Sequence, residues 1–294
     1  MTVIATAALK GSNDVELNTK NHLKLIDEAA DAGARLLVFP EISLQGYPPN
    51  FSTFNPSRLR STFESAERVD DGPHVKIIER RAREREIYVV YGLNEKEDSP
   101  GVIYNTAVLT GPQGFVGKYR KVHVGITEQL TWRKGNDWPV FQTPLGRIGI
   151  QICYDKKWPE SSRELALRGA DILVTPTAWF SSFGDAGPED TQMAEHYELY
   201  DRVRAVENAR WFISSNYVGS FGGAQFVGMS QIVDPMGRIV QSTGQLDSGL
   251  AIADVDIADG ILNAHSMQGP RLVRDRMPAT YRASSGLIPP AVDG

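Results

Sequence analysis

The chain contains one cysteine, Cys153, which closes the apolar run Ile148–Cys153 and is followed within six residues by Trp158 and Pro159. Because proline is favoured in the first turn of a helix, this pattern predicts a strand-to-helix turn at the cysteine. A thiol at such a turn projects from the edge of a sheet, near backbone N–H groups that can bind an oxyanion, and this suits acyl transfer. Taken alone, a single cysteine is more often a small buried core residue. It also excludes an intramolecular disulfide and a multi-cysteine metal site.

Two charged residues occupy comparable positions at the ends of apolar or basic runs. Glu41 directly follows Leu36–Pro40, where burial can raise its pKa toward the range of a general base. A loop or helix-capping glutamate is the simpler alternative for this residue alone. Lys121 lies in the predicted strand Lys118–His123, and alternation places Lys121 on the same face as His123. An inward-facing ammonium needs a carboxylate partner, whereas a solvated edge strand would need none.

The segments around these residues resemble the nitrilase superfamily of carbon–nitrogen hydrolases, in the family's order and at compatible separations, from about Val3 to about Asp256. The resembling segments are Phe39–Glu41 with Gly46–Tyr47, Tyr119–His123, Gly146–Asp155, Leu165–Asp171, Arg204–Asn208 and Val233–Gly237. The resemblance implies that Cys153 is the nucleophile, Glu41 the general base and acid, and Lys121 the cation that stabilises the tetrahedral oxyanion. It also implies a cysteine thioester as the acyl-enzyme intermediate.

Further expectations rest on the same resemblance. Glu128 resembles the family's second glutamate, which positions the substrate, although its neighbours depart from the usual pattern. The backbone N–H of Tyr154 is expected to join Lys121 as an oxyanion donor, and Tyr47 and Trp179 are expected to contact the substrate. The implied fold is a four-layer α-β-β-α sandwich of the α/β class, and the implied assembly is a homodimer or larger homo-oligomer.

The residues after the cysteine bear on the substrate. Cys153-Tyr154-Asp155 is similar to the amidase-like branches, whereas true nitrilases typically have Trp-Glu after the cysteine. Lys156 and Lys157 resemble the basic pair that holds the substrate carboxylate in carbamoylases, although two solvated lysines at a helix entrance would look the same. A small linear amide is therefore the first expectation and a carbamoyl compound the alternative. A nitrilase, an acyltransferase and a catalytically silent scaffold are the remaining possibilities.

The elements that must position these residues follow from hydrophobic periodicity and turn chemistry. The predicted strands are Val3–Leu9, Leu36–Phe39, Ile87–Tyr91, Ile103–Leu109, Phe115–Val124, Ile148–Cys153, Ile172–Thr175, Phe212–Ser215, Gln231–Asp234 and Leu250–Val255. The predicted helices are Leu17–Ala32, Pro73–Glu86, Pro159–Arg168 and Thr191–Ala209. Hairpin turns are predicted at Gly111–Gly114, Pro144–Gly146 and Asp234–Gly237. We expect one α/β domain over residues 1–277 and an extended tail over residues 278–294.

Charge and composition narrow the class of partner. With 41% hydrophobic and 23% charged residues, the composition is that of an ordinary globular protein. The net charge of −5 and the pI near 5.6 lack the basic excess that binding to a phosphate backbone needs, so we expect no nucleic-acid partner. No stretch approaches eighteen uninterrupted apolar residues, and no basic segment precedes the first apolar run. We therefore expect a cytoplasmic protein without membrane contact.

The histidines give no sign of a metal site or a cofactor. His22, His74, His196 and His265 are scattered singly without metal-ligand spacing. A Cys–His pair is the commoner way to activate a thiol. The family pattern nevertheless has a histidine at the position of His123 without using it as a base, so we expect a structural role for that residue.

Overall fold

The computed structural model describes residues 1–48, 55–125, 127–183, 191–268 and 273–281. Its strands are β1 (Thr2–Lys10), β2 (Leu36–Val38), β3 (Tyr88–Lys96), β4 (Ile103–Gly111), β5 (Gly114–Arg120), β6 (Val140–Thr143), β7 (Gly146–Ile150), β8 (Ile172–Pro176), β9 (Phe180–Phe183), β10 (Trp211–Phe221), β11 (Ala224–Val227), β12 (Gln231–Val233), β13 (Ile239–Ser242) and β14 (Gly249–Val255). Its helices are α1 (Val15–Asp31), α2 (Pro56–Ser65), α3 (Pro73–Glu84), α4 (Pro159–Leu167), α5 (Thr191–Asn208) and α6 (Ile257–Gln268), with short 3-10 turns η1 (Glu128–Leu130), η2 (Cys153–Lys157) and η3 (Pro278–Thr280).

Alternation along the strands builds a core between two layers of sheet, because successive side chains point to opposite faces. Leu36 and Val38 of β2 enter this inner core together with Ile172 and Val174 of β8, which belong to the other layer. Leu37, between the first two, points outward into a separate apolar cluster. Strand β10 joins the layers, since its first half pairs with β8 and β12 and its second half with β1 and β11.

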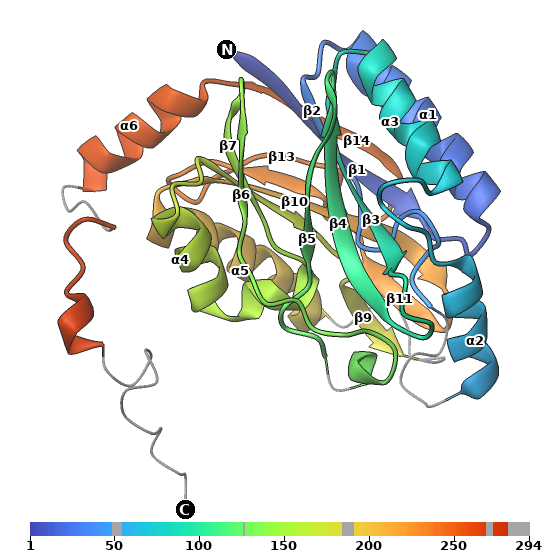
Figure 1. Cartoon of the computed structure of the whole chain (residues 1–294). Coiled ribbons are helices and arrows are strands. Elements are labelled where there is room, and N and C mark those ends of the chain that lie inside the picture. The colour runs from blue at the N-terminus through green and yellow to red at the C-terminus, as the bar shows by residue number, and fades with distance from the viewer. Residues whose placement is uncertain (49–54, 126, 184–190, 269–272, 282–294) are drawn as a thin grey trace, which may run out of the picture.

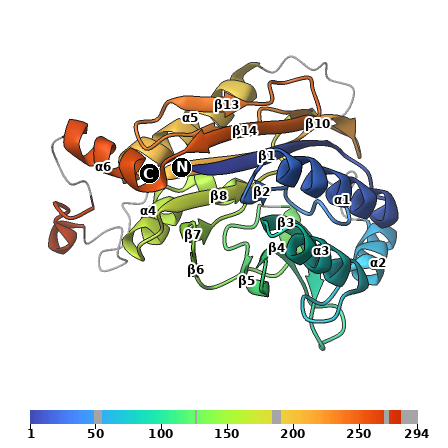
Figure 2. The ribbon, with the colours of Figure 1, turned by 90° about the horizontal axis from the view of Figure 1, so that it is seen from above.

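Helices cover the outer face of each layer. Ile26 of α1 and Ile78 of α3 pack on the outward side chains of the first layer. Leu165 of α4 and Ala205 of α5 pack on Leu173 of β8 in the second layer. Figure 1 and Figure 2 show α1 and α3 on one side of the strands and α4 and α5 on the other. The prediction of an α/β fold with a four-layer α-β-β-α arrangement is confirmed.

Strand direction explains how distant residues meet. Strand order is β5-β4-β3-β2-β1-β10-β8-β7-β6, and the pairs from β3 through β7 are parallel. Strand β5 also runs parallel to β3, because both are antiparallel to β4. The carboxyl ends of β2, β5, β7 and β8 therefore lie at one edge of the molecule, where functional loops of α/β proteins gather. Glu41, Lys121 and Cys153 each follow one of these ends.

The predicted helices are present as α1, α3, α4 and α5, with ends within two residues of those expected. The three predicted hairpins are the antiparallel pairs β4–β5, β6–β7 and β12–β13. The sequence analysis missed α2 and α6 and the short strands β9 and β11. It could have found α2, because Asn55 caps that helix and is followed by proline in the first turn.

Two predicted strands are too long. Strand β5 ends at Arg120 and β7 ends at Ile150, so Lys121 and Cys153 lie in the turns beyond the strands. Lys121 donates its backbone N–H to Asn105 of β4 but does not continue the ladder of β5. Within the described part of the chain, no helix is long and apolar enough to cross a membrane. Residues 282–294, most of the expected tail, lie outside the described residues.

Candidate active site

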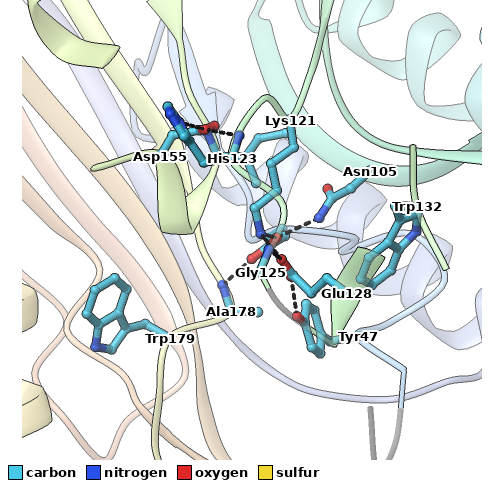
Figure 3. A network of polar contacts seen from close by, with 12 residues as sticks. Tyr47, Asn105, Lys121, His123, Gly125, Glu128, Trp132, Asp155, Ala178 and Trp179 are labelled. Carbon is cyan, nitrogen blue, oxygen red and sulfur yellow. Dashed lines mark hydrogen bonds and ion pairs between the residues drawn. The ribbon is translucent and has the colours of Figure 1, made fainter. Parts of the chain in front are cut away.

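The carboxylate of Glu41 is held by three hydrogen-bond donors in a buried setting. Its Oε1 accepts from Nζ of Lys121 and from Nδ2 of Asn105, each at 2.6 Å, and its Oε2 accepts from the backbone N–H of Ala178 at 2.9 Å. Figure 3 shows Lys121, Asn105 and Ala178 arranged around this point. Burial raises the pKa of Glu41, and the ammonium of Lys121 opposes that rise. The shift brings the carboxyl toward the range that a general base needs.

Lys121 places one positive charge between two carboxylates. Its side chain is 1% exposed, and Nζ donates to Glu41 Oε1 at 2.6 Å and to both oxygens of Glu128 at 2.9 and 3.0 Å. Burial disfavours the ammonium, but the nearby carboxylates of Glu128 and Glu41 outweigh burial and raise the pKa of Lys121 well above its usual value. Lys121 therefore remains a cation whose hydrogens all point at carboxylate oxygens.

Cys153 opens η2 with a backbone φ of +45°. This left-handed conformation is unusual for a residue other than glycine, and such strain is characteristic of functional turns. Burial and then the carboxylate of Glu41 raise the pKa of the Cys153 thiol well above its usual value, whereas Lys121 and the N–H of Ala178 act in the opposite direction. The resting group is therefore a protonated thiol, which needs a base before it can attack. The N–H of Ala178 that lowers the pKa of this thiol also donates to Glu41 at 2.9 Å.

Glu128 lies beside Lys121 and accepts hydrogen bonds from two further donors. Its Oε2 accepts the backbone N–H of Gly125 at 2.6 Å, and its Oε1 accepts the hydroxyl of Tyr47 at 2.5 Å. Burial, followed by the charge of Glu128, raises the pKa of Tyr47 well above its usual value. Tyr47, expected to contact the substrate, thus uses its hydroxyl to hold Glu128. The ring of Tyr47 packs against Trp132 with centroids 5.9 Å apart.

Asp155, which the sequence analysis did not single out as a functional residue, ties the lysine segment to the cysteine turn. One oxygen of its fully buried carboxylate accepts from the backbone N–H and Nδ1 of His123, at 2.8 and 2.9 Å. The other accepts from the Tyr119 hydroxyl at 2.7 Å and the Ile152 N–H at 2.9 Å. Tyr119 and His123 lie two residues before and after Lys121, and Ile152 directly precedes Cys153. The structure thus gives His123 a structural partner, as the sequence suggested.

The structure separates the two lysines that were predicted to bind substrate. Lys156 is fully buried, with Nζ 2.7 Å from Asp201 Oδ1 and 3.3 Å from the ring centroid of Tyr197. Burial lowers the pKa of Lys156, and Asp201 opposes that effect. The expectation that Lys156 offers a free cation to a substrate carboxylate is therefore corrected, because Asp201 already neutralises it. This partner lies 45 residues away in α5, so no local pattern could reveal it.

Lys157 is placed differently. Its Nζ lies 5.3 Å from the ring centroid of Tyr154 and 5.2 Å from that of Trp179. Among the residues that the structure describes, no carboxylate lies within ion-pair distance of Lys157. Trp179 follows Ala178 directly, and its indole donates to the carbonyl of Met193. The ammonium of Lys157 therefore lies beside the rings of the residues that directly follow Cys153 and Ala178 in the chain.

Sequence reasoning missed Asn105 and the backbone of Ala178. Asn105 lies inside the predicted strand Ile103–Leu109, where an amide side chain in a mostly apolar run is a usable signal. Ala178 acts through its main chain, which carries no mark in the sequence. The described residues hold no cluster of three or more His, Cys, Asp or Glu side chains that could bind a metal ion.

Comparisons with known proteins agree with this geometry. The carbon-nitrogen hydrolase family profile matches residues 3–261. A protein named nitrilase from Pyrococcus abyssi is 32% identical over 235 residues, covering 80% of this chain and 81% of that protein. The human omega-amidase NIT2 is 29% identical over 252 residues, covering 82% and 83%.

Solved structures share the fold. Nit3 of Saccharomyces cerevisiae, a member of branch 10 of the nitrilase superfamily, matches with a TM-score of 0.80 at 23% identity over 94% of this chain and 97% of that one. A mutant amidase from Nesterenkonia sp. AN1 matches with a TM-score of 0.73 at 25% identity, over 96% and 95%. That amidase shows covalent addition of the acetamide moiety of fluoroacetamide at its active site cysteine. The resemblance stated from the sequence motifs is confirmed.

Proposed function

The chain belongs to the carbon–nitrogen hydrolase family, and we propose that it cleaves the carbon–nitrogen bond of a small linear amide to a carboxylic acid and ammonia. One observation carries this proposal: the buried ammonium of Lys121 donates to Glu41 at 2.6 Å and to Glu128 at 2.9 Å, at the edge of the sheet where the turn of Cys153 also lies. We infer from it that Glu41 is the base that takes the proton of the Cys153 thiol. Relatives named omega-amidase, and the amidase whose cysteine carries an acetamide moiety, support an amide substrate.

Acylation begins with transfer of the thiol proton. The S–H bond of Cys153 breaks, Glu41 accepts the proton, and the sulfur attacks the amide carbon to give a tetrahedral oxyanion. The ammonium of Lys121 and the backbone N–H of Tyr154 stabilise that oxyanion, each donor contributing about 3–4 kcal/mol. Because Lys121 contacts both oxygens of Glu128, one of its hydrogens can turn to the oxyanion while another stays bound.

Collapse of the intermediate releases ammonia and leaves a thioester. Glu41 returns its proton to the departing nitrogen, so the carboxylate is ionised again when water enters. The carboxylate then takes a proton from that water, which attacks the thioester carbon. A second tetrahedral oxyanion forms at the same donors, and its collapse frees the acid and restores the thiol.

The alternative substrate is an N-carbamoyl amino acid or a carbamoyl amine, from which hydrolysis releases ammonia and carbon dioxide. Lys157 favours this alternative, because its Nζ lies 5.3 Å from the ring centroid of Tyr154, the residue after Cys153, and no carboxylate of the described residues lies within ion-pair distance of it. A substrate carboxylate could supply that missing charge. Lys156 gives no such support, since Asp201 neutralises it.

Ammonia release tests both candidates. The purified protein is assayed on short aliphatic and aromatic amides, N-carbamoyl amino acids and nitriles, with Cys153→Ala in parallel. Release from neutral amides that disappears in the variant supports the amidase function. A preference for carbamoyl substrates, with a KM that rises only for anionic substrates in Lys157→Ala, supports the alternative. Absence of release from any substrate would overturn both, and acyl transfer to added amines would then point to an acyltransferase.

We also propose a single catalytic domain over residues 1–277 and a cytoplasmic homodimer or larger homo-oligomer. The large exposed side chains of Leu262 and Met267 on α6, 64% and 71% exposed, support assembly. Light scattering of the purified protein measures the oligomer directly, and a monomeric mass would contradict it.

A further inference from the structure

The four acceptor positions of the Glu41 carboxylate are not equally occupied. An ionised carboxylate has two acceptor positions on each oxygen. Oε1 receives two short hydrogen bonds, from Lys121 and Asn105, each at 2.6 Å, whereas Oε2 receives one, from Ala178, at 2.9 Å. Among the residues that the structure describes, three positions are therefore filled, and the remaining one belongs to Oε2. Oε2 is therefore the oxygen with room to accept a proton.

Asn105 is fixed where it can fill Oε1. It is fully buried in β4, directly opposite Asn94 of β3, and its backbone carbonyl accepts the backbone N–H of Lys121 at 2.9 Å. Its side chain must present Nδ2 to Glu41, because an ionised carboxylate only accepts hydrogen bonds. An amide does not ionise, so this donor persists at every pH at which the protein is folded.

The side-chain oxygen of Asn105 indicates why an amide occupies this position. Oδ1 of Asn105 is buried and has no hydrogen-bond partner among the described residues. Leaving a buried acceptor unsatisfied is unfavourable for folding. An apolar residue of similar size would avoid that cost but would give Glu41 no donor. Of the two polar groups in the Asn105 side chain, only Nδ2 has a hydrogen-bond partner among the described residues, and that partner is the Glu41 carboxylate.

We propose that Asn105 is a positioning residue that occupies Oε1 of Glu41 and so directs the proton of Cys153 to Oε2. In this step the S–H bond breaks, an O–H bond forms on Oε2, and the sulfur electron pair attacks the substrate carbon. The later proton to the leaving nitrogen departs from the same oxygen. This inference rests on the proposed function for its place in the reaction, but the contact itself can be tested without a substrate.

Removing the donor should change the proton affinity of Glu41. Asn105 stabilises the ionised form, so its loss raises the pKa of the carboxyl further. A hydrogen bond to a charged group of this kind corresponds to a shift of about one pH unit. A residue that served only to pack the strand would not move this titration when replaced by an apolar residue of similar size.

Alkylation of the single cysteine by iodoacetamide, followed against pH, measures this effect directly. In the wild type, the rate should fall at low pH as Glu41 becomes protonated, and Glu41→Gln should remove that acid limb. Asn105→Leu should move the limb up by about one pH unit. Asn105→Asp keeps the shape and places a second carboxyl against Oε1, so it should move the limb at least as far.

Asn94→Leu is the matched control, because Asn94 is 2% exposed, lies opposite Asn105, and bonds to Trp132 instead of Glu41. Its acid limb should coincide with that of the wild type. An unshifted limb in folded Asn105→Leu or Asn105→Asp, checked by circular dichroism, would overturn the proposal, and either variant alone decides if the other does not fold. Failure of the wild type to hydrolyse any amide would instead refute the proposed function and leave this result standing.

Discussion

Replacing Lys121 by methionine should destabilise the protein in a way that depends on pH. The side chain is 1% exposed, and its Nζ lies 2.6 Å from Glu41 and 2.9 Å from Glu128. Methionine has a similar length but leaves both carboxylates buried without their cation. Breaking a buried ion pair on one side typically costs about 3–5 kcal/mol. We expect a loss of this size near neutral pH, together with loss of turnover.

The pH dependence follows from the carboxyl groups that remain. Burial already raises the pKa of Glu41, and Lys121 opposes burial, so the pKa rises further in Lys121→Met. When the pKa of a carboxyl is higher in the folded than in the unfolded state, the folded protein becomes less stable as the pH rises through the interval between the two pKa values. The loss amounts to about 1.4 kcal/mol for each pH unit of that interval. The penalty of the substitution should therefore be largest at about pH 8 and smaller at about pH 5.

Urea unfolding of wild type and variant at the two pH values measures this difference. Lys118→Met is the matched control, since Lys118 lies in β5 three residues before Lys121, is 36% exposed, and pairs with Glu95, which keeps Arg120 as a second partner. The Lys118→Met change should lower the free energy of unfolding by less than about 1 kcal/mol, and this loss should vary little with pH. A Lys121→Met penalty that is equal at both values, or larger at the lower one, would refute the assignment of two carboxylates sharing one buried cation.

Three further changes test other parts of the site, each by chemical unfolding. Tyr47→Phe removes the donor 2.5 Å from Glu128 and should cost about 1–3 kcal/mol, because a buried carboxylate oxygen loses one of its two donors and keeps only Lys121; an unchanged unfolding midpoint would contradict that contact. Asp201→Asn leaves the ammonium of Lys156 buried without its counter-charge and should lower the free energy of unfolding by about 3–5 kcal/mol. Adding Lys156→Met should recover part of that loss. A double variant as unstable as Asp201→Asn alone would argue against the ion pair. Gly92→Ala would set a Cβ 2.2 Å from the backbone nitrogen of Ile42, which follows Glu41. Both the stability of the protein and the rate of alkylation of Cys153 should fall, and a variant with normal stability and rate would show that this turn can shift.

The sequence was enough to predict that the three central residues meet, because each follows an apolar run and the family motifs fix their order. It was not enough to place them relative to the strands. Lys121 and Cys153 were expected inside strands but lie one and three residues beyond the ends of β5 and β7. Apolar and basic runs continue through these turns, so periodicity gives no end point. The left-handed φ of Cys153 is likewise a property that only the folded backbone reveals.

Partners from distant segments were the least predictable part of the site. Asp201 lies 45 residues from Lys156, and Asn105 lies 64 residues from Glu41. Such pairs form because strands and helices bring the ends of different segments to one edge, which depends on the whole topology and not on local spacing. The basic pair at Lys156 and Lys157 therefore looked uniform in the sequence, although one lysine is neutralised inside the protein and the other is not.

The charge balance of the site links proton transfer to the choice of substrate. One ammonium, Lys121, faces the two carboxylates of Glu41 and Glu128, so the site is already negative while Cys153 carries its proton. Ionising the thiol before substrate arrives would add a second uncompensated charge in a buried place, which explains why the proton must pass to the carboxylate during attack. A neutral amide enters such a site without changing its charge. An anionic substrate adds another negative group and needs another cation, and Lys157, beside the ring of Tyr154, has no carboxylate within ion-pair distance in the described part of the chain. The effect of Lys157→Ala on KM thus separates the two substrate classes by sign of charge, independently of how fast either is hydrolysed.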